Sequence, residues 1–210
     1  MNKSPGLSGL SIEFYQTFWG KIKHLVINSL NEGFIKGELS QLQKQGVLSL
    51  LFKKGDPENL ENWRPISLLN TDYKILTRVL AQRLQKVLPK IINFDQQGYI
   101  KNRNIAFNIR QIQDIIDHAD NFNIDGIILF LDFRKAFDTV NWNFLYTVLK
   151  QFGFNQPFIS WIRTIYNNCT SCIMNNGWKS EFFTLKRGLR QGCPSSALIF
   201  LVLLSLFSVL

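Results

Sequence analysis

The first candidate for chemistry is a carboxylate, Asp132, which ends a wholly apolar run. Residues 127–131 read Ile-Ile-Leu-Phe-Leu after Gly126, a pattern typical of a central strand buried on both faces. A charge at the end of such a strand is costly to desolvate. The residue alone leaves two readings open: a carboxylate just past the strand that is exposed or pairs with Arg134 or Lys135, or a ligand for a hard cation such as Mg²⁺.

A second candidate is the loop 187–196, which reads Arg-Gly-Leu-Arg-Gln-Gly-Cys-Pro-Ser-Ser. Its two glycines let the backbone approach a ligand closely. The loop leads into an apolar stretch that begins at Ala197, so it opens onto a helix N-terminus, where anions bind favourably. Loops of Gly and Arg are common, and this pattern alone is weak.

The third candidate is a basic surface. Residues 64–103 carry eight Lys and Arg against two acids, a local charge of +6. A solvated helix face is one reading, but the near absence of compensating acids favours a phosphate-facing surface.

The cysteines offer a weaker lead. Cys169 and Cys172 have C-x-x-C spacing, whereas Cys193, His24 and His118 are scattered. A zinc site needs a second pair of ligands, so this reading has little weight. Three cysteines cannot form a disulfide framework, and we expect a reducing intracellular location, cytoplasmic or nuclear.

The elements that position these candidates can be read from apolar spacing. The first 45 residues predict mostly helix, 47–52 a strand, and 63–69 an extended segment because Arg64 precedes a proline. A long amphipathic helix follows, and its inward stripe is Leu76, Val79, Leu80, Leu84, Val87, Leu88 and Ile91.

The second half mixes helices and strands. A helix over 106–119 is predicted to turn Ile109, Ile112, Ile115, Ile116 and Ala119 inward. We expect a strand over 126–131, after which Asp138 caps or anchors a turn and Asn141 caps the next helix, ended by Gly153. Pro157 opens a further helix, and Asn175-Asn176-Gly177 turns a hairpin over 170–185. The predicted fold class is α+β.

Composition limits the function classes. The chain has 210 residues, 46% of them hydrophobic, which excludes a disordered tail. Its net charge of +9 favours RNA, DNA or an anionic membrane as partner. We expect no membrane partner, because the N-terminus carries no signal peptide and the apolar C-terminal run of 14 residues is short for a span.

Five motifs in one order resemble the reverse transcriptase domain of non-LTR, LINE-type retrotransposons. They occupy 4–10, 63–70, 95–99, 131–138 and 190–196, and read SPGLSGL, WRPISLLN, DQQGY, LDFRKAFD and RQGCPSS. The resemblance implies a right-hand polymerase. Residues 1–125 would form an N-terminal extension and the fingers, and 126–210 a partial palm with an incomplete antiparallel sheet and packed helices.

The resemblance also implies roles. Asp132 would ligate both ions of a two-metal nucleotidyl transfer using Mg²⁺ or Mn²⁺, assisted by the carbonyl of Phe133. Phe137 falls on the position that excludes a ribose 2′-hydroxyl, although it could be plain core. Lys53 and Arg64 match residues that grip the triphosphate of a dNTP, although both could be merely solvated.

The same resemblance implies contacts with an RNA template and DNA primer or an RNA–DNA hybrid. Gln191 and Gly192 would lie against the template and the nascent base pair. The cations expected to follow the nucleic-acid backbone are Lys74, Arg78, Arg83, Lys86, Arg103, Arg187 and Arg190.

The chain departs from the family pattern in several places. Ser8 stands where an Asp is usual, Arg134 where Glu is usual, and Ala197 where Pro is usual. The F/Y-A-D-D motif, which supplies two further carboxylates, is expected after the last helix, yet the last acid of this chain is Glu181. We therefore expect a polymerase fragment, lacking palm and thumb segments, that does not polymerise alone. The alternatives are a non-catalytic nucleic-acid-binding remnant and a non-functional fragment that aggregates.

Overall fold

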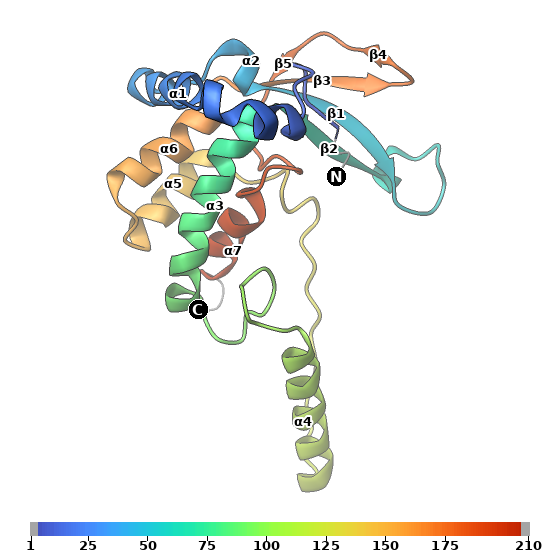
Figure 1. The fold of residues 1–210 in the computed structure, drawn as a ribbon. Helices are drawn as coiled ribbons and strands as arrows, with labels where there is room; N and C mark the ends of the chain where they lie inside the picture. The colour runs from blue at the N-terminus through green and yellow to red at the C-terminus, as the bar shows by residue number, and fades with distance from the viewer. Residues whose placement is uncertain (1–3, 207–210) are drawn as a thin grey trace.

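The computed structural model describes residues 4–206 as an α+β fold (Figure 1). The described helices are α1 (Ile12–Lys36), α2 (Gln41–Lys44), α3 (Thr71–Ile91), α4 (Ala106–Phe122), α5 (Trp142–Gln151), α6 (Gln156–Tyr166) and α7 (Ser196–Leu204). The strands are β1 (Gln45–Phe52), β2 (Trp63–Leu69), β3 (Thr170–Asn175), β4 (Trp178–Lys179) and β5 (Phe183–Thr184). The predicted fold class is thus confirmed.

Within residues 126–210 the described strand pairs are antiparallel, as expected, because β3 pairs with β4 and β5 in this sense, but the sheet as a whole is mixed. Its order is β2-β1-β3-β4, with β5 also paired to β3. Strands β1 and β2 are antiparallel, with Phe52 opposite Trp63, whereas β1 and β3 run parallel, with Val47 opposite Cys172. A parallel pair joins strands that are distant in the chain, so local patterns could not predict it.

The expected hairpin after α6 is confirmed. Asn175 pairs with Trp178, which leaves a loop of two residues, Asn176 and Gly177. Both have positive φ, 49° and 83°, as a type I′ turn requires. Asn and Gly tolerate this conformation better than other residues, so the sequence signal was specific.

The core lies among α3, α5, α6 and α7. Leu80, Leu84 and Leu88 of α3 are almost fully buried, as are Ile162 of α6 and Ile199 of α7. Figure 1 shows α3 and α7 side by side against α5 and α6. The apolar C-terminal run is a core helix over its described part, as expected. Within residues 4–206, no helix combines the length and apolarity needed to cross a bilayer.

The helix ends follow the predicted chemistry. The side chain of Asn141 accepts hydrogen bonds from the backbone N–H groups of Asn143 and Phe144 at the start of α5. Gly153 follows α5 with φ of 77°, the left-handed conformation that ends many helices. Pro157 lies in the first turn of α6. These caps fix where the two helices start and stop.

The predicted strand over 126–131 is wrong. The segment is extended but pairs with no strand in the described part of the chain. Ile127 is 97% exposed and Phe130 80%. A strand needs a neighbour to take its backbone hydrogen bonds. The apolar run signalled burial but could not show that a partner strand was present.

Helix α4 forms as predicted, but its predicted burial is wrong. It has no buried residue, and Ile109 and Ile115 are 64% and 57% exposed. Figure 1 shows α4 standing apart from the other helices, connected through extended chain. Its amphipathic spacing correctly predicts a helix. However, nothing within the described residues buries the apolar face of that helix.

Candidate functional site

The loop 187–196 docks against the segment that follows Asp132. The backbone N–H of Gly188 donates to the carbonyl of Val140 at 2.8 Å, and that of Leu189 donates to Phe137 at 2.7 Å. The indole N–H of Trp142 donates to the carbonyl of Gly188 at 2.9 Å. These bonds hold the loop 187–196 against residues 137–142.

The same loop also contacts β2. The backbone N–H of Ser67 donates to the carbonyl of Gln191 at 2.7 Å. Gly192 has φ of +106°, and a Cβ there would lie 2.6 Å from the carbonyl oxygen of Ser67. Only glycine fits this approach without a shift. Three motifs far apart in the sequence therefore meet around residues 191–192.

Asp138, in the segment that follows Asp132, is linked to the loop 187–196 by a hydrogen bond. The amide of Gln191 donates to its carboxylate at 3.3 Å. Partial burial raises the pKa of Asp138, and the hydrogen bond from Gln191 and the charge of Lys135 lower it, leaving a net increase. Asp138 thus anchors the turn, as the sequence indicated. The side chain of Gln191, expected against a template, points to Asp138.

Asp132 itself is exposed and lies in the extended segment, not at the end of a buried strand. Its neighbours Arg134 and Lys135 both approach Glu61: Arg134 forms an ion pair with it, and Lys135 Nζ lies 4.0 Å from its carboxylate. Glu61 could not be identified from the sequence, because no spacing rule joins residues 61 and 134. An exposed pair of this kind contributes about 0–1 kcal/mol, so it orients the segment weakly.

Lys53 and Arg64 lie at the same end of the sheet as Glu61. Arg64 pairs with Leu51 across β1 and β2, and the N–H of Lys53 donates to the carbonyl of Asn62 at 2.9 Å. Both cations are exposed. The Glu61 contacts therefore place the segment of Asp132 beside the end of the β1–β2 hairpin that carries them.

Phe137 packs against the core. Its ring stacks on Phe200 of α7, with centroids 4.9 Å apart and planes 25° apart. Phe133, by contrast, is 48% exposed. This packing on α7 supports the interpretation of Phe137 as an ordinary core residue.

The residues present do not fit a pair of divalent ions. No group of three His, Cys, Asp or Glu side chains meets anywhere in residues 4–206. Asp132 is an exposed carboxylate that belongs to no such group, and Asp138 is engaged by Gln191. All three cysteines are free and buried, and no zinc cluster forms among the described residues.

Arg103 was expected to contact nucleic acid, but its guanidinium is occupied. One terminal nitrogen donates to the carbonyls of Asn93 and Gln96, at 2.5 and 2.7 Å, and the other to Ile92 at 3.1 Å. These carbonyls follow the C-terminal end of α3, where a cation also favours the helix dipole. Arg103 is therefore a helix-end anchor.

Arg190 was expected at the nucleic-acid surface as well, but it is only 3% exposed. Its guanidinium donates to the carbonyl of Lys44 and lies over the ring of Tyr73, 5.3 Å from the centroid. A side chain this buried cannot contact a phosphate from solvent. It holds the loop 187–196 against the start of β1.

The other expected cations are accessible. Arg78, Arg83, Lys86 and Arg187 are exposed, and Lys74 is half-buried. Residues 73–94, which make up most of α3, contain no acid.

Asn70 is a buried residue whose side chain bonds to two other segments of the chain, and it was not among the candidate residues above. It accepts from the backbone N–H of Ser8 at 2.9 Å and donates to the carbonyl of Leu42 at 2.5 Å. Gly6 approaches so closely that a Cβ would lie 2.3 Å from the Asn70 side-chain oxygen. The N-terminal motif is thereby fixed to the start of α3. The sequence did carry a signal for this residue, because Asn70 is the last residue of the 63–70 motif.

Comparison with protein families decides the relationship. The model for "Reverse transcriptase (RNA-dependent DNA polymerase)" matches residues 52–208. The chain belongs to the reverse transcriptase family. All three motifs that meet around residues 191–192 lie inside the matched region, and so do Lys53 and Glu61.

Similar proteins come from retrotransposons. The chain is 40% identical over 200 residues to the "Transposon TX1 uncharacterized 149 kDa protein" of Xenopus laevis, covering 95% of this chain and 15% of that protein. It is 29% identical over 198 residues to the "Retrovirus-related Pol polyprotein from type-1 retrotransposable element R2" of Popillia japonica, covering 94% and 27%. The chain thus resembles the reverse transcriptase domain of non-LTR elements, and spans only a minor part of each relative.

Proposed function

We propose that this chain is the fingers (1–125) and part of the palm (126–210) of a retrotransposon reverse transcriptase. Its partners would be an RNA template, a DNA primer or RNA–DNA hybrid, and dNTPs. The supporting observation is that motifs far apart in the sequence meet, with Gln191 bonded to both Ser67 and Asp138. Three buried, reduced cysteines agree with an intracellular location, cytoplasmic or nuclear.

The residue roles follow from this arrangement. Asp132 would contribute one metal ligand, assisted by the Phe133 carbonyl, and Lys53 and Arg64 would bind the triphosphate. Their exposure and their position at one end of the sheet support these roles. Phe137 as the sugar-selecting residue has less support, because it already packs on α7.

The metal ions need more ligands than residues 4–206 bring together. Asp132 and the Phe133 carbonyl would hold one side of the site, and bound Mg²⁺ or Mn²⁺ would supply Lewis acidity for nucleotidyl transfer. We propose that the further carboxylates belong to the family's F/Y-A-D-D hairpin, and that residues 1–210 bind nucleic acid without extending a primer. This places the enzymatic activity in the larger polymerase.

A non-catalytic nucleic-acid-binding role is the second candidate, and the charge of α3 favours it. Arg78, Arg83 and Lys86 are exposed on a helix with few acids. Because each phosphate contact releases counterions, affinity for RNA would fall steeply with salt.

A salt titration tests the binding that both candidates share. Purified chain is titrated into a fluorescent RNA oligomer at increasing salt. With about four phosphate contacts, we expect affinity for a single strand to fall roughly 50-fold for a fourfold rise in salt. Soluble, monomeric protein that does not bind RNA at low salt would contradict the proposal, whereas protein that aggregates when purified would favour the reading of a non-functional fragment.

A further inference from the structure

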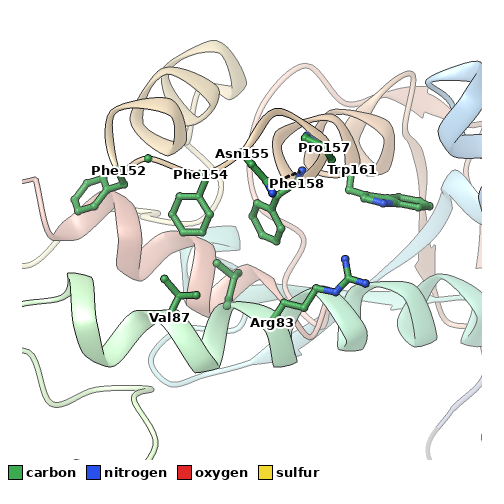
Figure 2. A pocket seen from close by; sticks show the side chains of 10 residues that line it. Arg83, Val87, Phe152, Phe154, Asn155, Pro157, Phe158 and Trp161 are labelled. Carbon is green, nitrogen blue, oxygen red and sulfur yellow. Dashed lines mark hydrogen bonds between the residues drawn. The ribbon is translucent and has the colours of Figure 1, made fainter.

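An aromatic cleft lies between α3 and the corner that joins α5 to α6. It has a volume of about 400 Å³, and the motifs described above do not line it. Figure 2 shows Arg83 and Val87 rising from α3 toward Phe154, Phe158 and Trp161 on the opposite side. This volume lies within the range of small-ligand pockets and is far too small for a duplex.

The aromatic wall is held in place by its own contacts. The rings of Phe154 and Phe158 stack with centroids 5.1 Å apart, and Trp161 stacks on Phe34 of α1 at 4.5 Å. The side chain of Asn155 accepts from the backbone N–H of Phe158 at 3.1 Å and caps α6. The rings are therefore presented in fixed orientations and lose little entropy when a ligand binds.

The two segments that line the cleft carry charge of one sign. Residues 73–94 and 139–180, which supply all its lining, contain eight Lys and Arg and no acid. Arg83 is exposed and forms no ion pair within the described residues. Lys86 and Lys90 follow it at helical spacing and are also exposed, so the three cations form a row along one face of α3.

We propose that this cleft binds a single-stranded segment of nucleic acid, with one or two bases among the rings and backbone phosphates along Arg83, Lys86 and Lys90. Aromatic platforms beside a cationic row are how proteins bind single strands without reading their sequence. The inference rests on the proposed function for the class of partner. It adds a single-strand site apart from the residues around Asp132.

Photo-crosslinking tests the location directly. The full chain is mixed at low salt with a single-stranded RNA oligomer that contains 5-iodouridine, irradiated, and mapped by mass spectrometry. We expect crosslinks at Phe154, Phe158 or Trp161. A duplex of the same sequence should yield few crosslinks at these rings, because its bases are already stacked.

Two variants test the energetics. Phe154→Leu removes a stacking surface, and Arg83→Gln removes the cation at the rim. We expect each to weaken binding of the single-stranded oligomer by about fivefold or more. Arg110→Gln is the matched control, because Arg110 is an exposed cation on α4 paired with Asp114, and it should have a smaller effect. Thermal melting of each variant shows that it is folded.

The outcomes separate this inference from the proposed function. RNA that binds but crosslinks only to residues 53–64, 132–138 or 187–196 would overturn the cleft and keep the proposed function. Unchanged RNA affinity in folded Phe154→Leu would also overturn it, as expected for a cleft that takes a peptide. No RNA binding at low salt would contradict both.

Discussion

Single residues of the same type have different roles here, and the contacts decide which. Arg83 is exposed beside an aromatic cleft, Arg103 is bonded to carbonyls after α3, and Arg190 is buried over Tyr73. The sequence assigned all three to nucleic acid, because spacing and charge show neither burial nor hydrogen-bond partners. By contrast, Gly192 and Asn141 were identifiable, since a close backbone approach and a helix cap each demand particular residue types.

Gly192→Ala tests the approach of the loop to β2. We expect a loss of about 1–3 kcal/mol in the free energy of unfolding, because φ is positive and the new Cβ would contact Ser67. Urea denaturation measures it. Gly153→Ala is the control: Gly153 also has positive φ, but no atom lies within 4 Å of a Cβ there. Equal losses for the two variants would refute a specific contact at Gly192.

Asp138→Asn tests the electrostatics of the site. The pKa of Asp138 is raised from its ordinary value of 3.8, chiefly by burial. The folded state therefore binds the proton more tightly than the unfolded state, and wild-type stability falls as pH rises from about 3.8 through the raised pKa. Asp138→Asn has no titrating carboxyl at this position, so its stability does not fall in this way. Its side-chain oxygen can still accept the hydrogen bond from Gln191. Melting at pH 3.5 and 7 should show Asp138→Asn gaining on the wild type at pH 7. A gain confined to pH 3.5 would contradict the sign.

At the scale of elements, the sequence pattern predicted which segments form helices and the hairpin. It did not predict which of their surfaces are buried. Helix α4 and the segment 126–131 were both expected to be buried and are exposed. An apolar pattern reports only that a surface would gain by burial. The parallel pairing of β1 with β3 was also beyond local patterns, because it joins distant segments.

Amide hydrogen exchange tests the exposed segment. We expect the amides of residues 126–131 to exchange with little protection, because no strand pairs with them among the described residues. Amides of β1, which pairs on both sides, should be protected by several orders of magnitude. Comparable protection of the two segments in monomeric protein would show that 126–131 has a partner.

At the scale of the whole molecule, the two halves of the chain share one core. Strand β1 pairs with β3, α3 packs against α7, and the loop 187–196 contacts β2. This arrangement brings the reverse transcriptase motifs together. The net charge of +9 is concentrated in part on α3 and on the acid-free segment 139–180. The arrangement of the elements and the positive charge thus agree with nucleic-acid binding. The described residues, however, form no group of three side chains that could hold a metal ion.

Primer extension tests the central claim most directly. The chain is incubated with dNTPs, Mg²⁺ or Mn²⁺, and an RNA template annealed to a DNA primer, with Asp132→Ala as the paired variant. We expect the RNA to be bound but no nucleotide to be added, because no group of three side chains that could hold the ions forms within residues 4–206. Incorporation by the wild-type chain that is abolished in Asp132→Ala would contradict this account.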